Sequence, residues 1–283
     1  MLRSILYILL FIQSITASTT VSNIIIVADI HGDITRFKEI LRDAKVIDKQ
    51  DEWIAPENTL VIQLGDQIDQ KDVDKDDISK HHHFASIYYT NILQEQAKAK
   101  NCNFISHIGN HELMNIDKIR NKPDILAIIA SRPIVSIVNN YLFCHGGFRL
   151  DHYNLLNKYN KTINDINTIW YKYVHRYPLT TYDQIILDQL ILDTTDSILY
   201  TRTIDDKNNT NILLKNLDIE YVFVGHTQTK YIYMKHNIWR LDLLLKTAFD
   251  SNSYNYIHII DDNIVVKHVE TLQPPSFINN IFT

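Results

Sequence analysis

Residues Asn23 to Asp33 read NIIIVADIHGD, a nearly continuous apolar run that ends in a group of polar residues. The uncharged run fits a β-strand that is covered on both faces. Asp29 and His31 follow at alternate positions, so both side chains can face one point beyond the strand end. Gly32 lets the backbone turn away there. The stretch predicts a buried strand of an α/β fold with two ligand-type side chains at its carboxyl end.

The same arrangement of strand and polar motif is expected at four more places. The motifs are GDQID (65–69) after Thr59–Leu64, GNHE (109–112) after Asn103–Ile108, HGG (145–147) after Tyr141–Cys144, and GHT (225–227) after Glu220–Val224. Segments with helical spacing of apolar residues, at 34–44 and 84–100, alternate with the first strands. Because ligands gather at the carboxyl ends of strands in α/β sheets, the five motifs are expected to converge.

The converging residue types are those of a site for two divalent metal ions. Two such ions, roughly 3.5–4 Å apart, clamp a phosphate group and lower the pKa of a bridging water. We expect Asp29 and His31 to bind one ion and Asp66 to bridge both. The expected ligands of the second ion are Asn110, His145 and His226.

His111 is the candidate general acid. It neighbours Asn110 and is expected to point elsewhere, toward the leaving group of a substrate. A nearby carboxylate would orient the imidazole and raise its pKa. Asp69, three residues after Asp66, is the candidate for that role. For each residue alone, a capping aspartate or a surface histidine is the simpler interpretation, and only the five coincidences together favour catalysis.

Composition argues against nucleic acid as a partner. The chain of 283 residues has a formal net charge of −5, and its basic residues are scattered rather than striped. Cys102 and Cys144 each adjoin an apolar run, so both are expected to be buried thiols rather than a disulfide. His81, His82 and His83 close a polar insertion, and because consecutive residues do not face one centre, a solvated loop is expected there.

The amino-terminal segment has the pattern of a secretory signal peptide. Arg3 precedes an uncharged apolar stretch from Ile5 to Ile15, and the small residues Ala17 and Ser18 follow. We expect residues 1–17 to be a signal peptide, 21–270 to form one domain and 271–283 to be a C-terminal tail. The protein would then be secreted or enter a compartment lumen, without a stable membrane span after signal removal. A membrane anchor or a buried first strand are the alternatives for this segment.

As a set, the motifs resemble those of the calcineurin-like metallophosphoesterase superfamily. The similarity is greatest to its phosphoprotein-phosphatase branch, and within it to the Shewanella-like phosphatases and related viral or bacterial members. GNHELMN (Gly109 to Asn115), HGG and GHT carry it, and it covers roughly Ile24 to Asp242. The resemblance implies an α/β sandwich of two central mixed β-sheets flanked by helices. It also implies a dinuclear site of manganese, iron or zinc with the ligands named above, and His111 with Asp69 as the acid pair.

The main departure from the family pattern concerns two arginines that bind the phosphate group in this family. Gln70 stands where the family has the first arginine, and Lys71 or Lys75 is the candidate substitute. The second arginine corresponds to Arg202 in the stretch ILYTR or, alternatively, to Lys172 in WYK. Arg202 is preferred because arginine binds phosphate oxygens bidentately, whereas lysine acts as a point charge.

The resemblance implies a phosphatase that hydrolyses phosphomonoesters of phosphoproteins, on serine, threonine or tyrosine. Arg202 and Asn110 are the expected substrate contacts. A nucleotide or dinucleotide phosphohydrolase of the same fold is an alternative, as is a degenerate metal-binding member with little activity, which Gln70 would favour. Asp242, followed here by three leucines, stands where the family has an aspartate soon followed by glycine.

Overall fold

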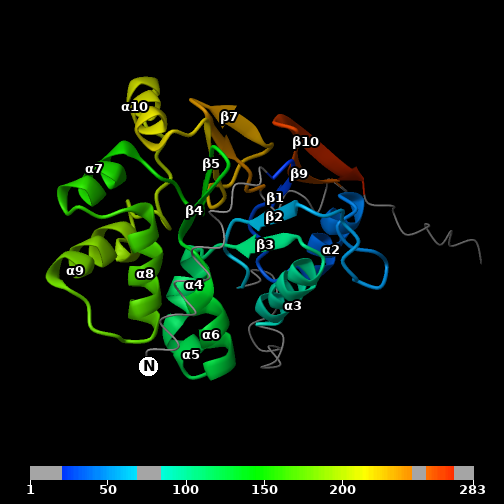
Figure 1. Cartoon of the computed structure of the whole chain (residues 1–283), viewed down its shortest axis with the longest axis horizontal. Helices are drawn as coiled ribbons and strands as arrows, with labels where there is room; N and C mark the ends of the chain where they lie inside the picture. The colour runs from blue at the N-terminus through cyan, green and yellow to red at the C-terminus, as the bar shows by residue number, and fades with distance from the viewer. Residues whose placement is uncertain (1–20, 69–83, 244–252, 271–283) are drawn as a thin grey trace, which may run out of the picture.

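The computed structural model describes residues 21–68, 84–243 and 253–270. In this part of the chain two β-sheets pack face to face, and helices lie on both outer sides (Figure 1). The expected sandwich of two mixed sheets is therefore confirmed. No helix among the described residues is long and apolar enough to cross a membrane. The predicted signal peptide, the tail at 271–283 and the insertion with His81, His82 and His83 lie outside the described residues.

The first sheet has the strand order β10-β9-β1-β2-β3. The three strands β1, β2 and β3 run parallel, and β9 and β10 form an antiparallel hairpin beside β1. Helices α2 and α3 make the crossovers between the parallel strands, as parallel pairing requires. The bounds are β1 Asn23–Val27, α2 Ile34–Asp43, β2 Thr59–Gln63, α3 Ala85–Ala99, β3 Asn103–Ser106, β9 Ser253–Ile260 and β10 Asn263–Glu270.

The second sheet has the strand order β4-β5-β6-β8-β7. Here β5, β6 and β8 run parallel, and the edge strands β4 and β7 run antiparallel to their neighbours. The bounds are β4 Val135–Val138, β5 Tyr141–Cys144, β6 Tyr221–Val224, β7 Tyr233–Lys235 and β8 Ile238–Arg240.

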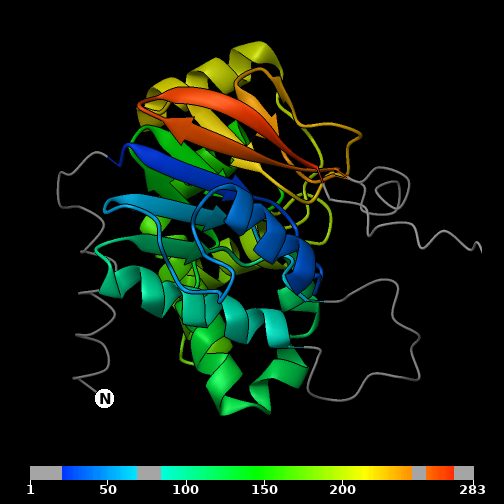
Figure 2. The same cartoon turned by 90° about the vertical axis from the view of Figure 1, so that its right-hand side faces the viewer.

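The remaining helices precede β4 or connect β5 to β6. They are α4 Asn110–Met114, α5 Ile116–Arg120, α6 Pro123–Ser131, α7 Leu150–Lys158, α8 Ile163–Val174, α9 Thr181–Leu187, the π-helix η2 Asp188–Leu192 and α10 Lys207–Leu217. In Figure 1, α2 and α3 lie on one side of the sheets and α7 to α10 on the other. Figure 2 shows α2 and α3 in front of the first sheet.

Alternation along β1 explains why its apolar run is almost continuous. Ile24 and Ile26 face the core between the two sheets, which also holds Phe143 and Phe223 with their rings stacked at 5.3 Å. Ile25 and Val27 face the core beneath α2 and α3. The strand is thus buried on both faces, as its sequence predicts.

Most expected elements form within one or two residues of their predicted ends. The largest difference among the strands is at β3, expected to reach Ile108 but ending at Ser106. The reason is that the Ile108 N–H donates to the Pro133 carbonyl oxygen (3.0 Å), so the chain leaves the first sheet and contacts the segment before β4. Cys102 and Cys144 are buried free thiols, as expected.

Candidate active site

The five motifs converge where β1, β2, β3, β5 and β6 end. Two glycines permit this close approach between strand ends. A Cβ atom at Gly109 would collide with the Asp66 carboxylate, and one at Gly225 would collide with the Asp29 carboxylate. The glycines of the third and fifth motifs therefore leave room for the acidic side chains of the second and first.

Asp66 lies at the centre of the group. Its Oδ2 atom is 3.3 Å from His145 Nε2, 3.8 Å from His31 Nε2 and 3.7 Å from His111 Nε2. The structure forms two triads that share this carboxylate, each compact enough to hold a metal ion. They are His31, Asp66 and His111, and Asp66, His145 and His226.

Asp29 and Asn110 complete the group. Asp29 Oδ2 is 3.8 Å from His31 Nε2, while its Oδ1 accepts a hydrogen bond from the His226 backbone N–H (3.2 Å). Asn110 Oδ1 is 2.9 Å from His145 Nε2. All six residues expected to bind metal are thus in one place, with Asp66 between the two halves.

Backbone carbonyls fix the imidazole rings. His145 Nδ1 is 2.7 Å from the Leu64 oxygen, and His226 Nε2 is 3.0 Å from the Tyr200 oxygen. A ring nitrogen that donates to a carbonyl leaves the other nitrogen with its lone pair directed into the site. This arrangement around a metal ligand fixes tautomer and orientation. It leaves Nε2 of His145 and Nδ1 of His226 as the ring nitrogens available to a metal ion.

Glu112, the last residue of GNHE, ties the second motif to the third. Its carboxylate is fully buried and accepts four backbone N–H bonds. Oε2 accepts from Asp66 (3.0 Å) and Gly109 (2.8 Å), and Oε1 accepts from Gln67 (2.8 Å) and Ile68 (3.3 Å). Glu112 therefore holds the loop that presents Asp66, a role that its position in GNHE did not predict.

Electrostatics of the acidic residues favour cations in the site. Burial and the neighbouring Asp242 carboxylate raise the pKa of Asp29 well above its usual value. Burial alone would also raise the pKa of Asp66, but the nearby histidines, led by His145, outweigh it and lower that pKa. A buried group of carboxylates is costly without positive charge. The oxygen and imidazole donors fit manganese, iron or zinc.

The pKa values of the two histidines in the second triad are shifted in opposite directions. Burial disfavours the charged ring of His145, but the charges of Asp66 and Asp29 outweigh this and raise its pKa to about 10. Burial and the charge on His145 lower the pKa of His226 to about 3. Because a metal ion requires neutral imidazoles, metal binding here would displace a proton from His145.

Three candidate ligands have left-handed backbone conformations. The φ angles are 47° at His31, 49° at Asp66 and 56° at His226. Such conformations are sparsely populated by residues other than glycine and cluster at functional sites, where the surrounding structure imposes them.

Only some of the residues expected to act as the general acid or to contact phosphate lie within the described part of the chain. His111 does not point away from the ligands: its ring is edge-on to that of His31 at 4.8 Å. Arg202 NH1 donates to the His226 carbonyl oxygen (2.9 Å), which brings its guanidinium to the site. The rival Lys172 bonds instead to Asp183, at the start of α9. Asp69, Gln70, Lys71 and Lys75 lie outside the described residues.

Comparisons with known proteins agree with this geometry. The family model for calcineurin-like phosphoesterases matches residues 22–230. The chain belongs to the calcineurin-like phosphoesterase family.

Relatives within the calcineurin-like family include Shewanella-like phosphatases, as expected. Shewanella-like protein phosphatase 1 of Plasmodium berghei (strain Anka) is 33% identical over 172 residues, which is 51% of this chain and 42% of that protein. Shewanella-like protein phosphatase 2 of Arabidopsis thaliana is 28% identical over 94 residues, which is 33% of this chain and 22% of that protein. The chain thus spans less than half the length of these relatives.

Two solved structures share the calcineurin-like fold at low sequence identity. A cold-active protein tyrosine phosphatase has a TM-score of 0.70 and 16% identity, covering 87% of this chain and 76% of its own. A protein serine/threonine phosphatase from Saccharomyces cerevisiae has a TM-score of 0.56 and 16% identity, covering 95% of this chain and 91% of its own. At this identity the similarity establishes the fold alone.

Two further residues lie near the calcineurin-like site, and only the first was singled out from the sequence, through the family resemblance. Asp242 is buried close to Asp29. It lies two residues after the end of β8, so it too is a polar residue that follows a strand. Arg240 in β8 is buried, and its NH2 donates to the Arg202 carbonyl oxygen (2.6 Å), which holds the Arg202 segment against the sheet.

Proposed function

We propose that this protein is a dinuclear, metal-dependent phosphatase that hydrolyses phosphomonoesters of phosphoproteins. The observation that supports the proposal most is the central position of Asp66, whose Oδ2 lies 3.3–3.8 Å from three imidazoles and is shared by both triads. Similarity to phosphatases named for protein substrates supports phosphoproteins over free nucleotides.

The ligand assignment rests on the donor atoms that face the site. Asp29, His31 and Asp66 would hold one metal ion, and Asp66 with Asn110, His145 and His226 would hold the other. Two divalent ions held there would neutralise the phosphate charge and lower the pKa of a water between them.

The protein's own groups would bind the phosphate and move the proton. Arg202 lies beside His226 and can donate its remaining N–H groups to phosphate oxygens, in addition to its bond to the His226 carbonyl. Asn110 offers an amide N–H to the same oxygens. His111, with 16% of its side chain exposed and Nε2 directed toward Asp66 Oδ2, would protonate the leaving oxygen.

A substrate panel tests the proposal. Purified protein loaded with manganese would be offered a phosphoserine peptide, a phosphotyrosine peptide, an aryl phosphate and a dinucleotide. We expect the protein to hydrolyse the aryl phosphate and at least one of the two phosphopeptides. Turnover of the dinucleotide with inert phosphopeptides would instead establish the nucleotide phosphohydrolase. Metal binding without turnover of any substrate would establish a degenerate member.

A further inference from the structure

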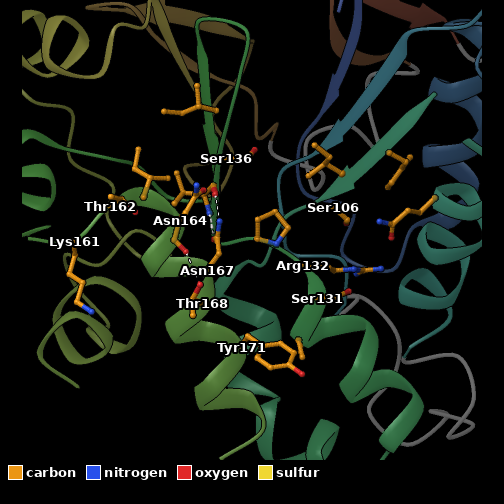
Figure 3. Close-up of a pocket in the computed structure, with 18 of the residues that line it drawn as sticks. Ser106, Ser131, Arg132, Ser136, Lys161, Thr162, Asn164, Asn167, Thr168 and Tyr171 are labelled. Carbon is orange, nitrogen blue, oxygen red and sulfur yellow. Dashed lines mark hydrogen bonds between the residues drawn. The ribbon is translucent and has the colours of Figure 1, made fainter. Parts of the chain in front are cut away.

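A buried arginine lies behind the candidate active site, where α6 ends. Arg132 is 4% exposed and follows the last residue of that helix. In Figure 3 its side chain points toward α3 and away from α8. Burial lowers its pKa to about 10, against the opposing effect of the Glu112 charge, so the guanidinium stays charged at neutral pH. No carboxylate of the described residues is among its hydrogen-bond acceptors.

The guanidinium instead bonds to α3 and to the second motif. Its NH2 donates to the Thr90 hydroxyl (2.7 Å) and to the Ile87 carbonyl oxygen (3.1 Å), both in α3. Its NH1 donates to the side-chain oxygen of Gln67. The Thr90 hydroxyl lies 3.2 Å from the same oxygen. Arg132 therefore fastens the buried Gln67 side chain to α3.

Gln67 directly follows Asp66 and connects the first three motifs. Its main-chain N–H donates to the Glu112 carboxylate of the third motif (2.8 Å). Its side-chain NH₂ donates to the His107 carbonyl oxygen (3.1 Å), at the end of β3. Its own carbonyl oxygen accepts from the Gly32 N–H of the first motif (2.8 Å). A displacement of Gln67 would therefore move the loop of residues 66–68, and the Asp66 carboxylate with it.

Glu112 and Arg132 place opposite charges on the two sides of Gln67. Glu112 accepts its main-chain N–H, and Arg132 donates to the end of its side chain. A buried carboxylate and a buried guanidinium are each costly without partners, and the amide between them joins both in one network. Apolar side chains in place of such networks often give equal stability, so stability alone does not explain a buried guanidinium here.

We propose that Arg132 is a positioning residue of the active site, which fixes the loop of residues 66–68 through Gln67. The inference rests on the proposed function, because the task of this loop is to present a shared metal ligand. None of the candidate ligands contacts Arg132, so its effect reaches the site only through the position of Asp66. Metal affinity and kcat should depend on Arg132, whereas KM should depend on Arg202 and stay unchanged.

Two substitutions of Arg132 test this role. Arg132→Met removes every donor, while Arg132→Lys keeps the charge but cannot reproduce the planar fork that reaches three acceptors. We expect Arg132→Met to bind manganese at least tenfold more weakly than wild type. Its kcat on an aryl phosphate at saturating manganese should fall at least tenfold, with KM within twofold. Arg132→Lys should lie between wild type and Arg132→Met in affinity and kcat.

Arg120→Met is the matched control. Arg120 is a largely buried arginine at the end of α5, and its guanidinium bonds to Asp117 and to the Tyr173 carbonyl oxygen rather than to the Asp66 loop. Its substitution should lower the thermal midpoint but leave manganese affinity and kcat within twofold. Hydrogen exchange of the metal-free proteins adds a readout that needs no activity. The amides of residues 66–68 should exchange at least tenfold faster in Arg132→Met than in Arg120→Met.

A double substitution separates positioning from stability. Arg132→Met combined with Gln67→Met replaces both partners of the bond by apolar side chains, so neither is left unpaired. The thermal midpoint should therefore recover relative to Arg132→Met alone. Manganese affinity and kcat should stay low, because the loop has still lost its attachment to α3.

Three results would overturn the proposal. The first is wild-type manganese affinity and wild-type exchange at residues 66–68 in Arg132→Met, or in Arg132→Lys if the methionine variant does not fold. The second is a loss of affinity and kcat no larger than that of Arg120→Met. The third is recovery of affinity and kcat together with the thermal midpoint in the double variant, which would show a purely structural role.

Failure of the proposed function would look different. A wild-type protein that hydrolyses no phosphomonoester would contradict the phosphatase. Faster exchange at residues 66–68 and weaker manganese binding in Arg132→Met would still support the positioning role, and their absence would still refute it.

Discussion

Glu112→Gln removes the acceptor that holds the Asp66 loop while keeping the size of the side chain. Each carboxylate oxygen accepts two backbone N–H bonds, so an amide NH₂ at either position faces two donors. The amide NH₂ should take the Oε1 position, where the lost bonds cost less free energy, because the bond from Ile68 is the longest at 3.3 Å. Hydrogen bonds to a charged group contribute about 1.5–3 kcal/mol each, so two lost bonds predict about 3–6 kcal/mol.

The lower end of that range is expected. Burial and the charge of Asp66 raise the pKa of Glu112, so removing its charge relieves part of an existing cost. We predict that the free energy of unfolding of the metal-free protein falls by about 3 kcal/mol. Metal affinity should fall as well, because Asp66 loses its fixed position.

Denaturant titration followed by tryptophan fluorescence measures the first effect, and calorimetric titration with manganese measures the second. Glu95→Gln is the control, since Glu95 is exposed and pairs at the surface with Lys98, so its loss should change stability by less than about 1 kcal/mol. A Glu112→Gln protein as stable as the control, with wild-type metal affinity, would refute the positioning role.

Three further predictions concern single residues. His111→Ala should keep its metals but lose about 10²–10⁴-fold in kcat, with a smaller loss on aryl phosphates that leave readily, and an equal loss on all substrates would contradict its role as acid. Arg202→Lys should raise KM about tenfold for phosphomonoesters without changing metal content, because lysine cannot bind bidentately; Lys172→Ala is the control and should leave KM unchanged. Burial lowers the pKa of His107 to about 4, so as the pH falls the unfolded chain takes up the proton before the folded protein does. The free energy of unfolding should therefore decrease by about 3 kcal/mol between about pH 6.5 and pH 4. Denaturant titrations of His107→Gln at pH 4.5 and 7.5 should show a smaller pH dependence than wild type, and equal dependence would show that another group controls it.

The strands that lead to the site could be predicted because they are buried on both faces. An apolar run such as that of β1 is interrupted only where the chain leaves the core, so the first polar residue marks the site. Asp29, Asp66 and His145 were located in this way. The left-handed backbone conformations of His31 and Asp66 could not be predicted from the sequence.

The rest of the fold depends on contacts that no local pattern records. The hairpin of β9 and β10 turns at Asp261 and Asp262, both with positive φ, and its pairing with β1 joins residues more than 200 positions apart. His111 was expected to point away from the ligands, but the short helix α4 directs its ring toward His31. Only the three-dimensional arrangement of α4 against the Asp66 loop, fixed by Glu112, determines that direction.

Metal stoichiometry tests the central claim most directly. Wild-type protein and Asp66→Asn would each be saturated with manganese, iron or zinc, freed of excess ion and subjected to elemental analysis. A shared carboxylate predicts two ions per wild-type chain and the loss of both, together with activity, in Asp66→Asn. Two tightly bound ions and near-normal turnover in Asp66→Asn, or a wild-type protein that is active with one ion, would contradict the dinuclear site.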